Sequence, residues 1–315
     1  MMGKKFLPFD ERKVRSAPMD VIAQVVVLFL LMFCGLLSCK ARLISDAGIA
    51  GMNKMVVYFA LPCLIVGKLQ QDADPMLMRD LIAVFLTGGA TMLLFGLVAR
   101  FLLFRGEDAP RRAVFASMCM FSNAGYMGLP VLNAAFGPEN LIYCVMYVAV
   151  FNLLGWSVGV MLFDRSALSI RKIATVPSLL AAVLGIVLFL LRIRLPGVVI
   201  DAMDSMAGIT TPLAMFIIGT RLAQLRLSDL RDVKMLFACA LRLLILPVLT
   251  YLLLTLFGFD GIVRATVTLC TAMPCAAQIV IQAENYHGDG ALASRGVAVS
   301  TLLSIATIPI ILLMV

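Results

Sequence analysis

The chain has 315 residues, of which 62% are hydrophobic and 14% are charged, and its formal net charge is +8. This composition excludes a pair of soluble domains and predicts a protein that crosses the membrane several times. The basic residues lie in loops between apolar segments, where they act as topology signals. Nucleic acid is therefore not an expected partner, while the lipid bilayer is.

Apolar segments of about 20 residues predict ten transmembrane helices. A polar, basic tail (residues 1–18) precedes the first five, which lie within residues 19–163: Val21–Ser38, Gly48–Leu69, Leu77–Leu103, Arg112–Phe136 and Leu141–Phe163. A charged connector (residues 164–173) leads to the second five, which lie within residues 174–315: Val176–Leu191, Met206–Leu222, Met235–Phe257, Ile262–Ala283 and Ala291–Val315. Because five is an odd number, the second half enters from the opposite side, which predicts two inverted repeats.

The loops differ in basic charge between the two sides of the membrane. On the side reached after the first span there are 14 basic residues: Lys40, Arg42, Arg100, Arg105, Arg111, Arg112, Arg165, Arg171, Lys172, Arg221, Arg226, Arg231, Lys234 and Arg295. The opposite loops hold five: Lys68, Arg79, Arg192, Arg194 and Arg264. This predicts a cytoplasmic connector in a plasma membrane, with both chain ends outside. The basic tail opposes that orientation, and translation from Met19 would remove the conflict.

Proline interrupts an apolar segment at corresponding places in the two halves. In the first half Pro62 is followed by Pro130, and in the second half Pro212 is followed by Pro274. Proline removes a backbone donor, and unpaired backbone groups at membrane depth are tolerated only where they are covered by protein or face a wet cavity. Matching interruptions are the best sequence pointer to the binding site of a transporter. A packing kink is the alternative for any one proline.

Polar side chains within these spans are the candidate binding residues, because such groups are expensive in a membrane. Asn123 precedes Pro130 by two helical turns, Gln278 and Gln282 follow Pro274, and Asn152 lies in the fifth span. Amides both donate and accept hydrogen bonds, which suits a carboxylate, although hydrogen bonding between helices is the alternative for each.

One arginine also falls within a predicted span. Arg242 lies about two turns inside it, so we expect its side chain to extend to the membrane interface; attraction of an anionic substrate is the alternative. The chain has one histidine and no His/Cys/Asp/Glu cluster, so no metal is expected. Phosphate loops, nucleophile triads and paired catalytic carboxylates are absent too, which argues against an enzyme, and no cofactor is expected.

The sequence resembles the auxin efflux carrier family, which includes bacterial permeases for malate-like dicarboxylates. The motifs that carry the resemblance are Asn123-Ala-Gly-Tyr-Met-Gly-Leu-Pro130, Pro212-Leu-Ala-Met-Phe-Ile-Ile-Gly219, and Ala272-Met-Pro274 leading to Glu284. The resemblance implies a carrier that works by alternating access, with broken fourth and ninth helices that cross at Gly128, Pro130 and Pro274. It also implies that Asn123 and Asn152 line the substrate site.

Three questions stay open after this resemblance. The expected substrate is a small organic anion such as malate or malonate, and the long central loop of the PIN-type plant members is missing, which disfavours auxin. Coupling to a proton or sodium ion and a homodimer are further options. A cation/proton antiporter of the same architecture is the alternative function, ranked lower because no Asp or Glu falls at the predicted crossing; a membrane receptor without transport activity is a third class.

Overall fold

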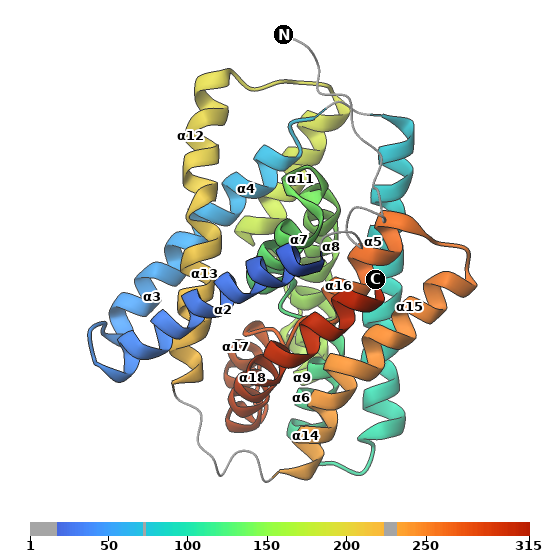
Figure 1. Cartoon of the computed structure of the whole chain (residues 1–315). Helices are drawn as coiled ribbons and strands as arrows, with labels where there is room; N and C mark the ends of the chain where they lie inside the picture. Colours follow the sequence, from blue (N-terminus) through green and yellow to red (C-terminus); the bar gives the residue numbers. More distant parts are fainter. Residues whose placement is uncertain (1–17, 72–73, 224–231) are drawn as a thin grey trace.

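A computed structural model of the chain describes residues 18–71, 74–223 and 232–315, and within them the fold is all helical (Figure 1). Most of the predicted tail lies outside the described residues. Seven helices of the described part are long and apolar enough to cross a membrane: Ala23–Lys40, Asp46–Lys68, Pro75–Leu103, Pro138–Phe163, Gly197–Leu222, Val233–Leu256 and Gly290–Met314. The prediction of an all-helical membrane protein is confirmed.

The other three predicted spans form shorter helices. The sixth is α11 (Pro177–Leu190), with 14 residues. The fourth divides into α6 (Ala109–Met120), the π-helical segment η3 (Ala124–Gly128) and α7 (Leu129–Phe136). The ninth divides into α16 (Gly261–Thr271) and α17 (Gln278–Asn285). The two segments that were predicted to be interrupted are therefore both discontinuous.

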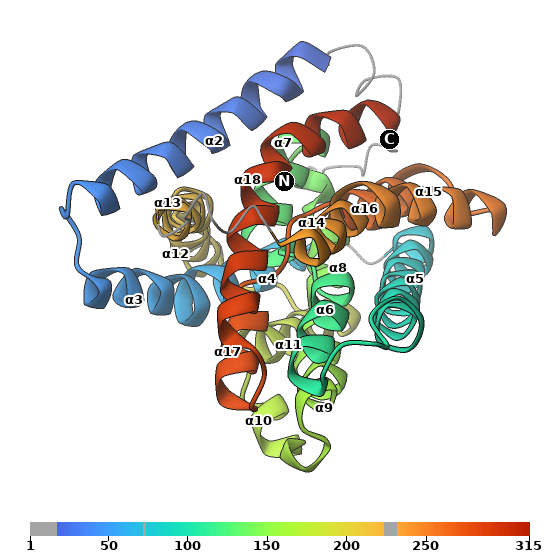
Figure 2. The same cartoon turned by 90° about the horizontal axis from the view of Figure 1, so that it is seen from below.

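The helices pack as two bundles (Figures 1 and 2). The first, here called the α2/α13 bundle, contains α2 (Pro18–Lys40), α3 (Asp46–Met55), η1 (Val56–Ala60), α4 (Leu61–Lys68), α11, α12 (Gly197–Gly208) and α13 (Thr210–Leu222). The second, here called the crossing bundle, contains α5 (Pro75–Val98), η2 (Ala99–Leu103), α8 (Leu141–Leu154), η5 (Gly155–Gly159), α9 (Val160–Phe163), α14 (Val233–Ala240), η8 (Leu241–Ile245), α15 (Leu246–Leu256), α18 (Gly290–Met314) and the four half-helices α6, α7, α16 and α17. The short segments η4 (Pro138–Asn140), η6 (Arg165–Ala167) and α10 (Ile170–Ala174) lie in connections.

Two glycines let the backbones of α2 and α13 touch. A Cβ atom at Gly35 would lie 2.1 Å from the carbonyl oxygen of Phe216, and one at Gly219 would lie 1.9 Å from that of Met32. Membrane helices gain most of their association from close packing, because lipid offers no hydrophobic driving force between them. This backbone contact explains why the first and seventh predicted spans form one unit.

Three prolines widen their helices without ending them. The π-helical segments η1, η3 and η8 each end immediately before a Leu-Pro pair, at Pro62, Pro130 and Pro247, and each proline lies in the first turn of the α-helix that follows. A proline ring clashes with the carbonyl four residues back, and a wider π turn moves that carbonyl away. The chain thus keeps helical hydrogen bonding through these prolines.

Candidate functional site

The two broken segments cross each other at the centre of the crossing bundle and pair through their backbones. The N–H of Asn123 donates to the carbonyl of Pro274 at 2.7 Å, and the N–H of Ala276 donates to the carbonyl of Phe121 at 3.1 Å. Between these bonds, Ser122 and Cys275 form an antiparallel bridge. Each extended segment therefore supplies the partners that the other lost where its helix stopped, which makes a break at membrane depth tolerable.

The predicted crossing residues fall at different distances from this pairing. Pro274 lies in the crossing itself, where its carbonyl accepts a hydrogen bond. Gly128 lies beside it, since a Cβ atom there would be 3.5 Å from the side chain of Met273. Pro130 lies outside: the chain is already helical again from residue 124, and Pro130 belongs to the first turn of α7. Placing the break of the fourth span at Pro130 was wrong, because the π turn of η3 accommodates this proline.

Arg242, in η8, is buried in the crossing, with 1% of its surface exposed. Its guanidinium donates to the carbonyls of Cys119 at 2.8 Å, Thr271 at 2.7 Å and Met273 at 3.2 Å. These carbonyls end α6 and α16, where the helix offers them no further N–H donor. The expectation that this side chain extends to the interface was wrong, because three planar donors find three buried acceptors within reach.

The position of Arg242 decides the electrostatic character of the crossing. Four half-helices end there, so the crossing collects two negative carboxyl-terminal dipole ends, from α6 and α16, and two positive amino-terminal ends, from η3–α7 and α17. The guanidinium neutralises the two negative ends. The two amino-terminal ends remain, and their positive dipoles favour an anion.

Asn123 and an open space lie at the start of η3. The Asn123 side chain is 7% exposed and makes no hydrogen bond to another described residue. Gly125 is buried, yet a Cβ atom at this glycine would meet nothing within 4 Å. The structure thus brings an unpartnered amide next to an internal space, at the amino-terminal end of a half-helix.

Gln278 and Gln282, one turn apart on α17, both face the π-helical segment η5. Gln282 is 1% exposed, and its Nε2 donates to the carbonyl of Gly155 at 2.6 Å, which leaves its buried Oε1 without a partner among the described residues. The Nε2 of Gln278 is likewise buried and unpartnered there, at 2.6 Å from the position of a Cβ atom on Gly155. Gly155 and Gly159 therefore let α17 approach η5 closely, a role that the sequence analysis missed and that their spacing of one turn could have indicated.

Asn152, the fourth predicted binding residue, makes a hydrogen bond within its own helix. It is 8% exposed, and its Nδ2 donates to the carbonyl of Val148 one turn earlier at 2.9 Å. It lies one turn before Gly155, in α8, which continues into the η5 segment that Gln278 and Gln282 contact. The predicted amides thus form two sets: Asn123 at the crossing, and the glutamines with the α8–η5 helix.

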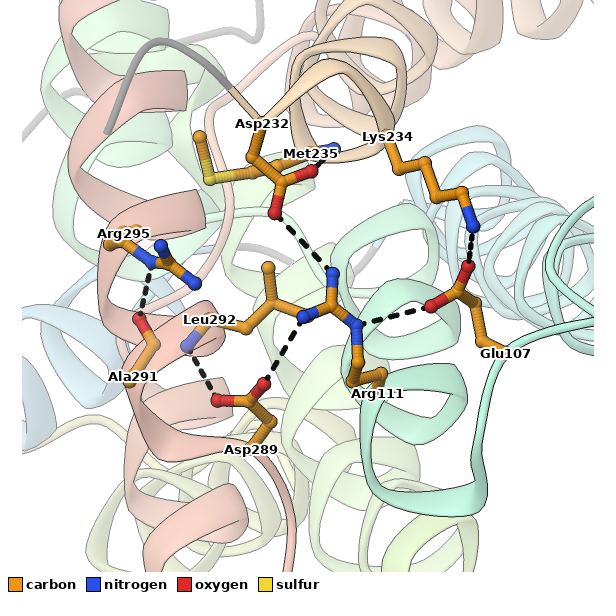
Figure 3. A network of polar contacts seen from close by, with 9 residues as sticks. All are labelled: Glu107, Arg111, Asp232, Lys234, Met235, Asp289, Ala291, Leu292 and Arg295. Carbon is orange, nitrogen blue, oxygen red and sulfur yellow. Dashed lines mark hydrogen bonds and ion pairs between the residues drawn. The ribbon is translucent and has the colours of Figure 1, made fainter. Parts of the chain in front are cut away.

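Ion pairs around Arg111 fix the outer end of α6 to two other helices of the crossing bundle (Figure 3). The guanidinium lies 3.1 Å from Glu107, 3.3 Å from Asp232 before α14, and 3.7 Å from Asp289 before α18. Lys234 also pairs with Glu107. The hydrogen bond from Lys234, with help from Arg111, lowers the pKa of Glu107 from its ordinary value despite burial. These contacts hold three helices together at the side predicted to be cytoplasmic.

A cavity of about 650 Å³ lies away from these residues, at the opposite end of α16 from the crossing. It is lined by the start of α5, by Tyr143 and by residues 258–263, and it includes the carboxylates of Asp74, Asp80 and Asp260. Arg79 also lines the cavity and pairs with Asp80, but the three carboxylates outnumber this cation, so the lining differs from the anion-favouring crossing. No cluster of three or more His, Cys, Asp or Glu side chains that could hold a metal occurs among the described residues.

The family model described as membrane transport protein matches residues 20–312, which covers both broken segments and both bundles. The chain belongs to this family, the auxin efflux carriers. It is 28% identical over 305 residues to a protein of Rhizobium meliloti named "Putative malonate transporter", with 92% of this chain and 94% of that protein covered.

Two archaeal proteins are similar in sequence to this chain over nearly their whole length. An uncharacterized transporter of Methanocaldococcus jannaschii is 24% identical over 302 residues, and one of Methanothermobacter thermautotrophicus is 25% identical over 296 residues. Each alignment covers 92% of this chain and 96% of the relative. All three matches are with transporters and extend over nearly the whole chain, so this member of the auxin efflux carrier family is a multi-pass membrane transport protein.

Proposed function

We propose that this auxin efflux carrier family member is a secondary active carrier of a small organic anion, a carboxylate such as malate or malonate. The observation that carries the proposal is Arg242. The guanidinium binds the carboxyl-terminal ends of α6 and α16. The positive amino-terminal ends of the other two half-helices and the amide of Asn123, beside the space at Gly125, stay available for an anion. The malonate named for the Rhizobium relative is an anion of the matching class.

The architecture of the proposal is ten spans in two inverted five-helix repeats, with the connector on the cytoplasmic side of the plasma membrane. The paired breaks in the fourth and ninth segments support it, since each repeat then contributes one half-helix pair to the crossing. In alternating access, the crossing bundle moves against the α2/α13 bundle. Coupling to a proton or sodium gradient supplies the driving force.

A cation/proton antiporter fits this crossing less well. The charged side chain buried there is an arginine, and the carboxylates near α16 line the separate cavity at its far end. A cation at the crossing would meet a guanidinium and two positive dipole ends. The anion carrier is therefore the function that the charges support.

Uptake of labelled malonate, malate and citrate into proteoliposomes tests the proposal. We expect uptake of at least one of them by the wild type and a large loss in Asn123→Ala. Asn133→Ala, an exposed asparagine on α7, is the matched control and keeps wild-type uptake. Absence of uptake of every carboxylate by folded wild-type protein, under both a proton and a sodium gradient, would contradict the anion carrier.

Binding can be tested independently of flux. A carboxylate that binds only the folded protein at a concentration 100-fold above its Kd stabilises the fold by about 2.7 kcal/mol. Melting the purified wild type against a panel of carboxylates should therefore show a raised melting temperature for the transported ones. A panel without any such shift would count against the proposal.

A further inference from the structure

Tyr126 makes a hydrogen bond that joins the two bundles. Its hydroxyl donates to Oδ1 of Asn53 at 2.6 Å, from η3, which runs directly into α7 of the crossing bundle, to α3 in the α2/α13 bundle. The other side-chain hydrogen bonds and ion pairs described above, around Arg242, Gln282 and Arg111, lie within the crossing bundle. The Tyr126 hydroxyl is thus a directional contact at a boundary that must shift if the bundles move.

The surroundings of Tyr126 divide into an apolar and a polar end. Its ring packs against a small buried cluster of Ile49, Val56 and Ile217, all from the α2/α13 bundle. Arg221 follows Ile217 of this cluster by one turn, in the last turn of α13, and its charge acts on the Tyr126 hydroxyl. The cluster holds the ring without fixing the bundles, since apolar contacts have no preferred direction.

Arg221 provides a cationic group at this boundary. Its side chain is exposed and has no hydrogen-bond or ion-pair partner among the described residues. An arginine and a tyrosine hydroxyl together provide several N–H donors and one O–H donor, the set that recognises a carboxylate. The adjacent space beside Gly125 and the free amide of Asn123, one turn before Tyr126, extend this set to the crossing.

We propose that the Tyr126 hydroxyl and the Arg221 guanidinium bind one carboxylate of the substrate, at the boundary between the bundles. This inference rests on the anion-carrier function proposed above and narrows its substrate to a dicarboxylate. One carboxylate faces Asn123 and the helix ends at the crossing, and the second faces Tyr126 and Arg221. Asn53 accepts the hydrogen bond of the tyrosine hydroxyl in the structure, and the carboxylate of the substrate replaces Asn53 as the acceptor.

Two consequences follow from this placement. A substrate held by both bundles couples its own binding to their relative position, which is what a carrier needs to prevent movement without cargo. A monocarboxylate can occupy only one end of the site, so Arg221 should discriminate between dicarboxylates and monocarboxylates. Tyr126 and Arg221 are then specificity residues.

Kinetics of labelled malonate and lactate uptake in proteoliposomes test the proposal, with Tyr126→Phe, Arg221→Gln and Asn53→Ala. Loss of a hydrogen bond to a charged group should raise the KM for malonate at least about tenfold in Tyr126→Phe and in Arg221→Gln. Arg221→Gln should leave the KM for lactate within about twofold, and Arg221→Lys should restore part of the malonate affinity. Asn53→Ala frees the hydroxyl and should not raise the KM for malonate.

The control and the contrary outcomes separate this proposal from the one on which it rests. Tyr58→Phe, on an exposed tyrosine of the neighbouring segment η1, should match the wild type. Wild-type uptake with an unchanged malonate KM in both Tyr126→Phe and Arg221→Gln overturns the inference alone. The inference is also overturned if Tyr126→Phe and Asn53→Ala raise the malonate KM equally and lower the melting temperature equally. That result would show that the Tyr126–Asn53 hydrogen bond only stabilises the fold. No uptake and no ligand stabilisation of the wild type overturn the carrier function, and the inference with it.

Discussion

Replacement of Arg242 by methionine should destabilise the protein by removing the group that caps both broken helices. Methionine retains much of the side-chain length and is tolerated in a helix, so the change removes mainly the charge and the donors. Three carbonyls, of Cys119, Thr271 and Met273, would lose their hydrogen bonds. The extended pairing of the crossing would then have to hold the carboxyl-terminal ends of α6 and α16 together without a cation.

The magnitude follows from the three bonds. Each buried acceptor left unsatisfied costs about 1–3 kcal/mol, which gives roughly 3–9 kcal/mol for three. Removing the guanidinium also removes its own desolvation penalty, of several kcal/mol, which offsets part of this cost. A net loss of about 3 kcal/mol corresponds to a melting temperature lower by about 6 °C, at the low end of the scale that applies to large domains.

Thermal unfolding followed with a thiol-reactive dye is a suitable assay, because five cysteines are fully buried in the folded protein: Cys119, Cys144, Cys239, Cys270 and Cys275. Their labelling reports the loss of the crossing bundle itself. Arg79→Met is the control: this side chain is 75% exposed and pairs with the neighbouring Asp80, a surface contact of small free energy, so the change should shift melting by about 1 °C or less. Melting of Arg242→Met within about 2 °C of the wild type would refute the capping role of Arg242.

Three further predictions test the packing, the open space and the ion pairs. Gly219→Ala should abolish stable folding, because its Cβ would lie 1.9 Å from a backbone oxygen of α2. In Gly208→Ala, the control, the new Cβ meets nothing within 4 Å. The yield of folded protein in size-exclusion chromatography should therefore equal that of the wild type for Gly208→Ala and be lost for Gly219→Ala. Gly125→Leu should fill the internal space and stop carboxylate uptake with little change in the melting temperature. Gly51→Leu, at an exposed glycine with open surroundings, is the control and should transport normally. Uptake by Gly125→Leu at the wild-type rate would show that the substrate does not pass through this space. Glu107→Gln should lower the melting temperature at pH 7, and the difference should be smaller at pH 3. The Glu107 pKa is lower in the folded protein, so its stabilisation is fully present above the unfolded value of about 4.3 and is lost as the pH falls through the folded pKa. Equal differences at both pH values would contradict the ion-pair explanation.

The proline pattern predicted that the fourth and ninth segments are interrupted, but it could not distinguish two responses of a helix to proline. At Pro274 the chain becomes extended, whereas at Pro130 it stays helical through a π turn. Both outcomes satisfy the backbone, one through a partner segment and the other through a wider helical turn. Which one occurs depends on whether a second broken segment lies opposite, and that is a tertiary fact.

Side-chain roles were harder to predict than breaks, for a related reason. Asn123 was found because a polar group at membrane depth is expensive and this one precedes Pro130 by two helical turns. The structure places it beside an internal space. Arg242 was assigned to the interface because its distance from the end of a span was the only available measure. Its partners are carbonyls of two other segments, at positions 119, 271 and 273, and backbone carbonyls leave no sequence signal.

The buried arginine also bears on why the candidate binding residues can be neutral amides. A site that relied on a free cation for anion recognition would bind its substrate strongly and release it slowly, which slows transport. Here backbone carbonyls accept the hydrogen bonds of Arg242, so in the proposed carrier the anion is attracted by helix ends and by the amide of Asn123, which are weaker and need no counter-ion. With Arg221 as the carboxylate partner at the boundary between the bundles, as proposed above, charge recognition is confined to the conformation that brings the two bundles together there. The carrier can then bind in one arrangement of the bundles and release in the other, with the fixed charge of the crossing unchanged throughout.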